Sequence, residues 1–191
     1  MARVFVALLR GVNVGGNTLS MAALRGLCAE IGLRNVRTYV QSGNLVFEAD
    51  GTPERWAETL ERALVGKARL PVTVLVRTGA EMASVVTRNP FLREKSVDPA
   101  RLYVTFLKDA PAKSTLAALK AIEAGPDRLS HTGREVYLHC PTGYGRTKLS
   151  NNALEKMLGI AATTRNWRTV TTLAEMAATA PRPKVAPQAR G

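Results

Sequence analysis

The sequence is poor in the residues that most often do chemistry in enzymes. Its 191 residues include only two cysteines and two histidines, and aromatic residues make up 5% of the chain. Cys28 and Cys140 do not make a disulfide framework, and the scattered Cys and His residues match no zinc-binding spacing. His131 and His139 have no evident Ser or Cys partner for a catalytic triad. The sequence therefore predicts no metal site and no cofactor, and it leaves catalytic residues unknown.

Acidic residues and long apolar runs are also scarce. The chain has 27 Lys and Arg against 15 Asp and Glu, a formal net charge of +12, and both halves are basic. This excess favours nucleic acid or another polyanion as a partner, although it also serves solubility alone. The apolar run Val4–Leu9 is too short for a signal peptide, and no run approaches the length of a membrane span. We therefore expect a cytoplasmic protein that does not enter a membrane.

The spacing of apolar residues predicts a series of strands and helices that occurs twice. The first series has strands at 4–9, 35–41, 44–48 and 71–76, and helices at 19–31, 53–68 and 79–87. The second has strands at 102–107, 127–131, 135–140 and 161–164, and helices at 113–124, 149–158 and 167–178. In chain order each series reads βαββαβ followed by a helix.

This repetition predicts an α+β fold of two tandem ferredoxin-like subdomains related by an internal duplication. The two hairpins match at an offset of 90 residues, with Gln41-Ser42-Gly43-Asn44 against His131-Thr132-Gly133-Arg134 and Val46-Phe47 against Val136-Tyr137. We expect a first subdomain at residues 1–92, a second at 93–178, and a flexible, basic, proline-rich tail at 179–191.

Three separated blocks of sequence have a distinctive pattern. They read LLRGVNVGGNTLSMAALR at residues 8–25, VRTYVQSGNLVF at 36–47 and GRTKLSNNALEKMLGIAATTRNWRTV at 145–170. Together they resemble the bacterial domain-of-unknown-function 1697 (DUF1697) family. The resemblance covers nearly the whole chain except the tail, and it implies a two-subdomain α+β fold. It implies no activity, so the function has to be argued from the residues.

The loop after the first strand has the context of a phosphate-binding loop, since a strand enters it and a helix leaves it. Asn17 stands where a Walker A motif has its lysine, which disfavours nucleotide hydrolysis but still allows backbone N–H groups to bind one phosphate. The alternative is a tight connection in which Asn17 or Thr18 caps the helix. The turn at 41–44 should lie beside this loop. The candidate residues of this first site are Arg10, Gly11, Asn13, Gly15, Gly16, Asn17, Gln41, Ser42 and Asn44.

The hairpin strands suggest a second kind of site. Arg37, Tyr39 and Gln41 share one face of a strand, and Tyr137 and His139 share one face of another. An exposed sheet face with aromatic residues and arginine is how RNA-recognition modules stack bases. Because the strand at 4–9 has no polar face, both sides of its sheet need a cover. We therefore favour packing of one subdomain on the other over an open RNA-binding face.

The stretch from 143 to 173 carries more polar and basic residues than folding needs. Five basic residues stand there against one acidic residue, with neutral hydrogen-bonding groups and one indole. Trp167 has an alternative role as a core residue, and Asn166 as a helix cap. The candidate site residues of this stretch are Tyr144, Arg146, Lys148, Asn152, Arg165, Asn166 and Trp167. Of these, we expect Arg146, Lys148, Arg165 and Trp167 to share one accessible face.

The favoured interpretation is a protein that binds nucleic acid or a nucleotide-like, phosphorylated anion through a basic surface of Arg, Asn and Trp residues. One alternative is an enzyme that acts on a phosphorylated or nucleotide substrate and uses the arginines as electrostatic clamps. A second alternative is a protein–protein or structural role.

Overall fold

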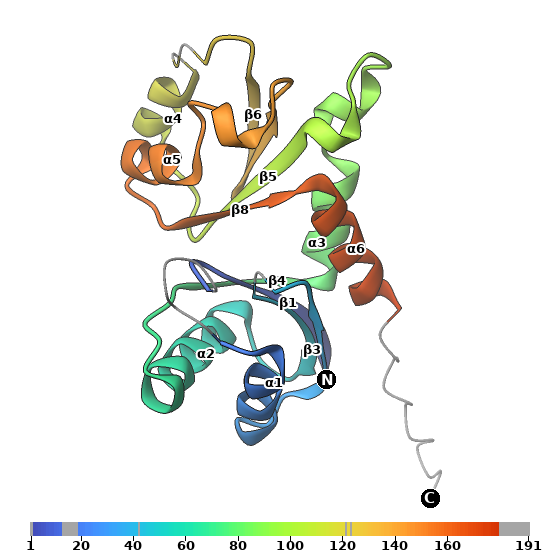
Figure 1. Cartoon of the computed structure of the whole chain (residues 1–191), viewed down its shortest axis with the longest axis vertical. Coiled ribbons are helices and arrows are strands. Elements are labelled where there is room, and N and C mark those ends of the chain that lie inside the picture. The colour runs from blue at the N-terminus through green and yellow to red at the C-terminus, as the bar shows by residue number, and fades with distance from the viewer. Residues whose placement is uncertain (1, 13–18, 42, 121, 123, 180–191) are drawn as a thin grey trace, which may run out of the picture.

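The protein has an α+β structure with two four-stranded antiparallel sheets, here in a computed structural model. The structure describes residues 2–12, 19–41, 43–120, 122 and 124–179. Figure 1 shows one sheet with its helices in the lower half of the view and the other in the upper half. Within the described residues there are six α-helices, and none of them is long and apolar enough to cross a membrane.

The first unit is built on the sheet with strand order β2-β3-β1-β4. Apolar residues of α1 and α2 cover one face of this sheet, and α3 follows the last strand. Its strands are β1 (Arg3–Leu9), β2 (Arg34–Tyr39), β3 (Asn44–Ala49) and β4 (Val74–Thr78), and its helices are α1 (Met21–Glu30), α2 (Pro53–Ala68) and α3 (Gly79–Thr87).

The second unit has the corresponding order, β6-β7-β5-β8. Apolar residues of α4 and α5 cover one face of its sheet, and α6 follows the last strand. Its strands are β5 (Leu102–Leu107), β6 (Arg128–Thr132), β7 (Glu135–His139) and β8 (Ala162–Asn166), and its helices are α4 (Lys113–Lys120), α5 (Asn151–Leu158) and α6 (Trp167–Ala178). In the described parts of the connections there are three short 3₁₀ helices: η1 (Pro90–Arg93), η2 (Pro99–Arg101) and η3 (Tyr144–Arg146).

Local sequence explains where most helices begin. The side chain of Thr52 accepts a hydrogen bond from the N–H of Arg55, and Pro53 fits the first turn because it has no N–H to leave unpaired. Thr78 and Glu81 form a reciprocal capping box at α3. Asn166 caps α6 through the N–H of Thr169. The cap at Asn166 confirms one of the two roles that the sequence allows for this residue.

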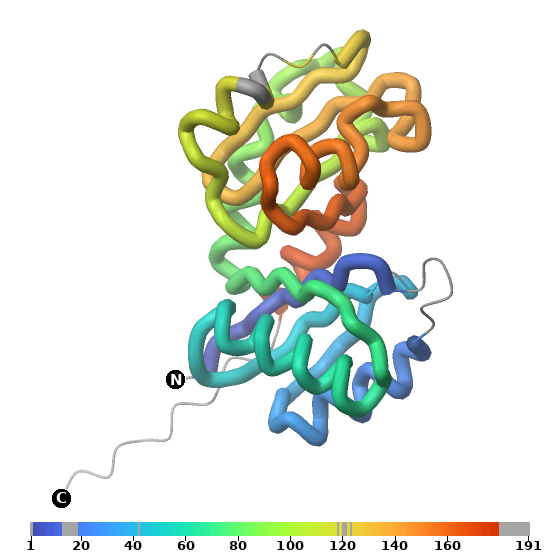
Figure 2. Tube along the Cα trace, turned by 90° about the vertical axis from the view of Figure 1, so that its left-hand side faces the viewer, coloured from blue at the N-terminus to red at the C-terminus, as the bar shows by residue number. Residues whose placement is uncertain are grey.

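A single hydrophobic core joins the two units. The inner faces of both sheets contribute to it, through Val6 and Val46 from the first sheet and Val104 and Tyr137 from the second. Helices α3 and α6 pack side by side and close this core along one flank, as Figures 1 and 2 show from two directions. Because β1 is covered by its own helices on one face and by this shared core on the other, its residues from Phe5 to Leu8 are fully buried, as its apolar sequence predicts.

The match between the hairpins at an offset of 90 residues is wrong by one position. Val46 points into the shared core, whereas Val136 points into the outer core of the second unit. The backbone hydrogen bonds show the correct correspondence, since Leu9 N–H donates to Gly43 O and Leu107 N–H donates to Arg134 O, both at 2.8 Å. The equivalent residues of β3 and β7 are therefore 91 positions apart. A slip of one residue in a strand moves every side chain to the opposite face.

A buried arginine on β4 reaches from the first unit to the second. The Arg77 side chain is 1% exposed. Its Nη2 donates to Leu107 O at 2.7 Å, at the end of β5, and its Nε donates to Glu135 Oε1 at 2.9 Å, at the start of β7. Burial lowers the pKa of Arg77 while the Glu135 carboxylate opposes that change. These bonds supply partners for a charge that would be costly to bury alone.

A second buried arginine makes the reciprocal connection from β8. Arg165 is 9% exposed, and burial lowers its pKa to about 10. Its Nη2 donates to Leu9 O at 2.9 Å, at the end of β1, and its Nε donates to Asn44 Oδ1 at 2.6 Å, at the start of β3. Each sheet therefore sends one arginine to the end of the other sheet's central strand.

We expect Arg165→Met to lower the free energy of unfolding by about 2–4 kcal/mol, because it leaves Leu9 O and Asn44 Oδ1 buried without this donor. The exposed neighbour Arg168→Met is the matched control, with a change within about 0.5 kcal/mol. Urea unfolding measures both values. Equal unfolding midpoints for the two variants would show that the inter-unit bonds of Arg165 contribute nothing to stability.

Gly43 should tolerate a side chain less well than Gly32. Both have positive φ, +70° and +84°, but a Cβ at Gly43 would lie 2.8 Å from Leu9 Cβ, whereas a Cβ at Gly32 would meet nothing within 4 Å. Gly32→Ala should cost about 1–2 kcal/mol from the backbone alone, and Gly43→Ala about 1–3 kcal/mol more from the clash. Thermal and urea melts of the two variants test this order.

Candidate functional site

The start of the glycine-containing loop lies against the hairpin turn, as the sequence predicts. Leu9 N–H donates to Gly43 O, and Gly43 packs closely against both Leu9 and Val12. Gly11 and Gln41 are exposed beside this contact. The remaining loop candidates, Asn13, Gly15, Gly16, Asn17 and the turn residue Ser42, lie outside the described residues.

Two polar candidates of the first site form contacts between the units. Arg10 donates to both carboxylate oxygens of Glu155 on α5, at 2.6 and 2.5 Å, and this partner raises the pKa of Arg10. Asn44 is buried, donates to Tyr39 O at 2.9 Å and accepts from Arg165. In the structure these two side chains join the units, so their contribution to folding is evident and a contribution to a ligand stays a prediction.

The sheet faces considered for base stacking are covered. Tyr137 is buried in the shared core, its hydroxyl donates to Val85 O at 3.1 Å, and burial raises its pKa to about 12. Tyr39 packs against the same core, and Arg37 donates to the Met176 carbonyl on α6. The open RNA-recognition face is therefore wrong for these strands, and the favoured alternative, packing of the units on each other, is what the structure has.

The expectation of one accessible face is wrong for two of its four residues. Alternation along β8 turns Arg165 toward the first unit, where it is bonded internally. Trp167 is 7% exposed and belongs to the shared core, the alternative role that the sequence allows. Arg146 and Lys148 are exposed. Asn152 and Asn166, which the sequence also proposes, are exposed as well.

Tyr144 leads to the residues that gather near α6. Its hydroxyl accepts a hydrogen bond from the N–H of Asn151 at 2.8 Å, and the centroid of its ring lies 4.9 Å from the ring centroid of Tyr103 on β5. Tyr103 is opposite Asn166 in the pairing of β5 with β8. Arg101, at the end of η2, lies against Gly143, since a Cβ there would be 3.2 Å from Arg101 Nη1. Segments far apart in sequence thus meet at one end of the second sheet.

A cavity of about 450 Å³ opens at this place. The residues that line it include the aromatic Tyr103 and Trp167 and the polar Asn166 and Arg168. We define the Tyr103 surface by six residues. Tyr103, Asn166 and Arg168 line the cavity, Arg101 follows the lining residue Ala100, Tyr144 contacts the ring of Tyr103, and Arg146 belongs to the same 3₁₀ helix as Tyr144.

The cations of the Tyr103 surface differ from most others near a cavity or interface. Arg101, Arg146 and Arg168 are exposed, and across the described residues no carboxylate lies within ion-pair distance of them. A guanidinium group without a carboxylate partner can form two parallel bonds to a phosphate or carboxylate ligand. The arrangement therefore suits an anion that also carries a planar ring.

A second cavity, of about 270 Å³, lies between the units but is less suited to an anion. Its cations face carboxylates: Arg134 Nη2 is 2.6 Å from Glu81, and Lys108 Nζ is 3.7 Å from Glu61. Glu54 and Glu58 also line it. An anionic ligand there would have to displace existing ion pairs.

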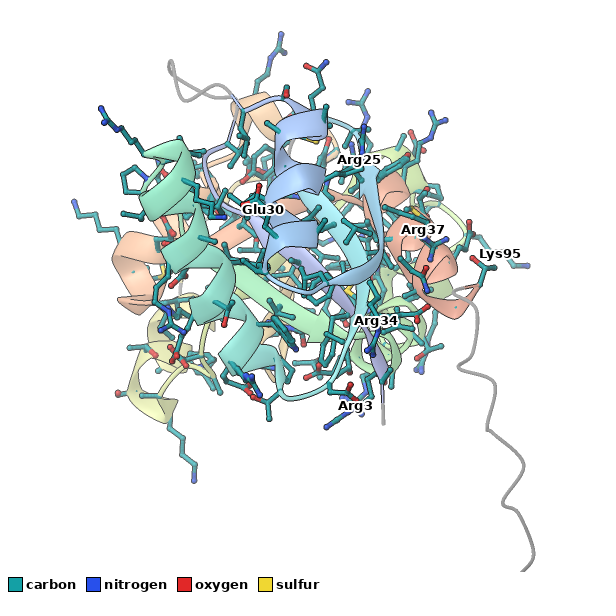
Figure 3. All side chains as sticks on the ribbon, turned by 90° about the horizontal axis from the view of Figure 1, so that it is seen from below. Arg3, Arg25, Glu30, Arg34, Arg37 and Lys95 are labelled. Atoms are coloured by element: carbon teal, nitrogen blue, oxygen red, sulfur yellow. The ribbon has the colours of Figure 1, made fainter. Side chains whose placement is uncertain are left out.

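Cations on the outer side of the first unit are also engaged. Figure 3 views this side and labels Arg25, Arg34 and Glu30 among others. Arg25 donates to Thr38 Oγ1 at 2.9 Å, Arg34 pairs with Asp50 at 3.3 Å, and Glu30 pairs with Lys67. Other arginines of the first unit, Arg55, Arg62 and Arg69, are exposed with no carboxylate partner among the described residues.

The described residues offer little for covalent catalysis. Burial raises the pKa of Cys28 to about 12 and also raises the pKa of Cys140, so neither thiol is an activated nucleophile. His131 contacts the Gly133 carbonyl in a turn, and His139 contacts Arg128. No cluster of three or more His, Cys, Asp or Glu side chains fit to hold a metal occurs among these residues.

Arg101, Tyr103 and Arg168 are the functional candidates that the sequence-based lists do not include. Arg101 and Tyr103 flank Leu102 at the start of a strand, where alternation indicates that both point away from the face of Leu102. Alternation therefore predicts that the two side chains point the same way, but it does not predict which residues lie beside them. The pairing of β5 with β8, which brings Tyr103 to Asn166, is set by tertiary structure.

The fold and the sequence each have a known counterpart. The conserved bacterial protein SP0830 from Streptococcus pneumoniae has a similar structure, with a TM-score of 0.76 and 21% sequence identity over 93% of this chain and 99% of that chain. At this identity the likeness shows the fold alone. No curated protein matches the chain. The family described as "Protein of unknown function (DUF1697)" matches residues 1–137, from the start of the first unit into β7, and on that match over more than half of its length the chain belongs to the DUF1697 family.

Proposed function

We propose that the protein binds nucleic acid or another phosphate-bearing, nucleotide-like anion at the Tyr103 surface. The observation that carries this proposal is the exposed guanidinium group of Arg168 in the wall of a cavity that Tyr103 and Trp167 also line. Two further exposed arginines without a carboxylate partner among the described residues belong to neighbouring segments: Arg101 follows the lining residue Ala100, and Arg146 shares η3 with Tyr144, whose ring contacts Tyr103. Phosphate contacts by Arg and Lys release counterions from a polyanion and supply most of the affinity of such binding. The net charge of +12 adds long-range attraction for the same class of partner.

The difference between internally bonded arginines and exposed arginines supports this location. Arg77, Arg165 and Arg10 have internal acceptors that hold the units together. Arg146 and Arg168 have exposed guanidinium groups with no such acceptor among the described residues. Exposed guanidinium groups without a carboxylate partner contribute little to folding stability. Binding of an anionic ligand would explain why they occur beside an aromatic cavity.

The enzyme alternative has weaker support. An enzyme for a phosphorylated substrate would use the same arginines as clamps, but it also needs a group that moves a proton or attacks. Around the Tyr103 cavity the described side chains supply a phenol, an amide, an indole, a guanidinium and the hydroxyl of Thr171, which donates to the Trp167 and Arg168 carbonyls. We therefore propose binding without turnover as the function, and a protein–protein role only if phosphate-bearing ligands fail to bind.

We also propose that the two units are ferredoxin-like repeats from an internal duplication, divided as 1–92 and 93–178, with the tail from 179 as a separate segment. The reciprocal bonds of Arg77 and Arg165 support this, because the two donors and their carbonyl acceptors occupy equivalent places in the two sheets. A nucleic-acid ligand agrees with the cytoplasmic location that we propose.

Removing charge from the Tyr103 surface should weaken binding to a mixed-sequence oligonucleotide. For each of Arg101→Gln, Arg146→Gln and Arg168→Gln, the slope of log affinity against log salt should fall by about 0.7–0.9 for every phosphate that the variant no longer neutralises. Fluorescence anisotropy over a range of salt concentrations measures the slope.

Arg62→Gln is the control for net charge, since it removes one exposed cation from α2 in the first unit. It should leave the slope close to that of the original protein. If all four variants bind with the same affinity and slope, while their melting curves show intact folding, the Tyr103 surface is not the binding site.

A further inference from the structure

We infer that the Tyr103 cavity takes one unpaired base, so that the ligand of this protein is a single-stranded nucleic acid rather than a duplex. This inference rests on the proposed function and narrows its ligand. It starts from the shape of the cavity, which the phosphate contacts alone would not require.

The cavity has an aromatic wall that is already held in place. The ring centroids of Tyr103 and Tyr144 are 4.9 Å apart, and the planes of the two rings are inclined by 36°. Tyr144 is in turn fixed through its hydroxyl, which accepts from the N–H of Asn151. Trp167 closes the inner side from the shared core. A rigid ring with one side supported by another ring is a platform on which a base can stack at low entropic cost.

The cavity also has a polar group placed to meet the edge of a base. Asn166 accepts from the N–H of Thr169 at 2.8 Å through Oδ1, which fixes the orientation of its amide. The Nδ2 of Asn166 makes no hydrogen bond within the part of the chain that the structure describes. Asn166 and Tyr103 are both residues that line the cavity. An amide N–H₂ can donate to the carbonyl or ring-nitrogen acceptors that every base has.

Cations flank the cavity where the phosphates of a strand would pass. Arg168 is part of its wall, and Arg101 follows Ala100, which is also part of its wall. The volume of about 450 Å³ lies within the range of small-ligand pockets, about 300–1,000 Å³. Bases in a duplex are stacked and paired with each other, so only an unpaired base can enter a cavity of this kind.

The experiment compares four probes with matched numbers of phosphates: a single-stranded oligothymidine, the same oligomer with abasic sites, a DNA duplex and inorganic polyphosphate. The proteins are the full chain, Tyr103→Leu, which removes the stacking ring but keeps apolar volume, and Tyr103→Phe, which keeps the ring. Fluorescence anisotropy and competition give the affinities, and melting curves check the fold.

We expect the single strand to bind the original protein more tightly than the abasic oligomer, the duplex or polyphosphate. Tyr103→Leu should weaken single-strand binding by about 5- to 100-fold with an unchanged salt slope, since stacking does not release counterions. Tyr103→Phe should retain the affinity. Polyphosphate binding should be the same for all three proteins.

Equal binding of the abasic and base-containing oligomers to the original protein would overturn the inference even if Tyr103→Leu failed to fold. Duplex binding as tight as single-strand binding would overturn it as well. In both cases the proposed function would stand if the arginine variants still lowered the salt slope. If no phosphate-bearing probe bound at all, the proposed function itself would fail, and the inference with it.

Discussion

The structure depends on two buried guanidinium groups that cross between the sheets in opposite directions. Arg77 and Arg165 sit at equivalent positions of the last strand in each sheet, and each donates to the carbonyl at the end of the other sheet's central strand. A buried guanidinium is tolerated only where its donors are satisfied, so these bonds fix how one sheet sits on the other. Apolar packing in the shared core is less directional and would allow small slides that these hydrogen bonds forbid.

The basic residues of the chain differ in whether a carboxylate of the protein neutralises them. Those at the contact between the units, such as Arg10 with Glu155 and Arg134 with Glu81, are neutralised inside the protein. Those around Tyr103 face solvent without a carboxylate. Net charge alone therefore overstates the surface that an anion meets, and it does not locate it. Exposed arginines without a carboxylate partner also occur on the first unit, among them Arg62, so the proposed location follows from the aromatic cavity that Arg168 lines.

The sequence predicts the elements of this fold well and the directions of individual side chains poorly. Apolar runs such as Val4–Leu9 correctly indicate buried strands, because a strand covered on both faces cannot carry polar residues. Alternation along β8 gives Arg165 and Asn166 opposite directions, but not which direction leads to solvent and which to the other sheet. The predicted hairpin offset was wrong for a related reason. Gly43 and Gly133 are identical in the sequence match, whereas the backbone hydrogen bonds show that Gly43 and Arg134 are the structurally equivalent residues. Tyr103 was missed because its neighbours come from segments that only tertiary structure brings together.

The inter-unit contact and the candidate site meet on one strand, and this links folding to binding. Arg165 points from β8 into the first unit, and the next residue, Asn166, points to the Tyr103 cavity and caps α6. Trp167 then lies in the shared core and is also one of the residues that line the cavity. Three consecutive residues thus anchor the units, orient an amide and close the cavity. The geometry at Tyr103 is therefore a property of the two units packed together, because the second unit alone would lose the acceptors that hold Arg165 in place.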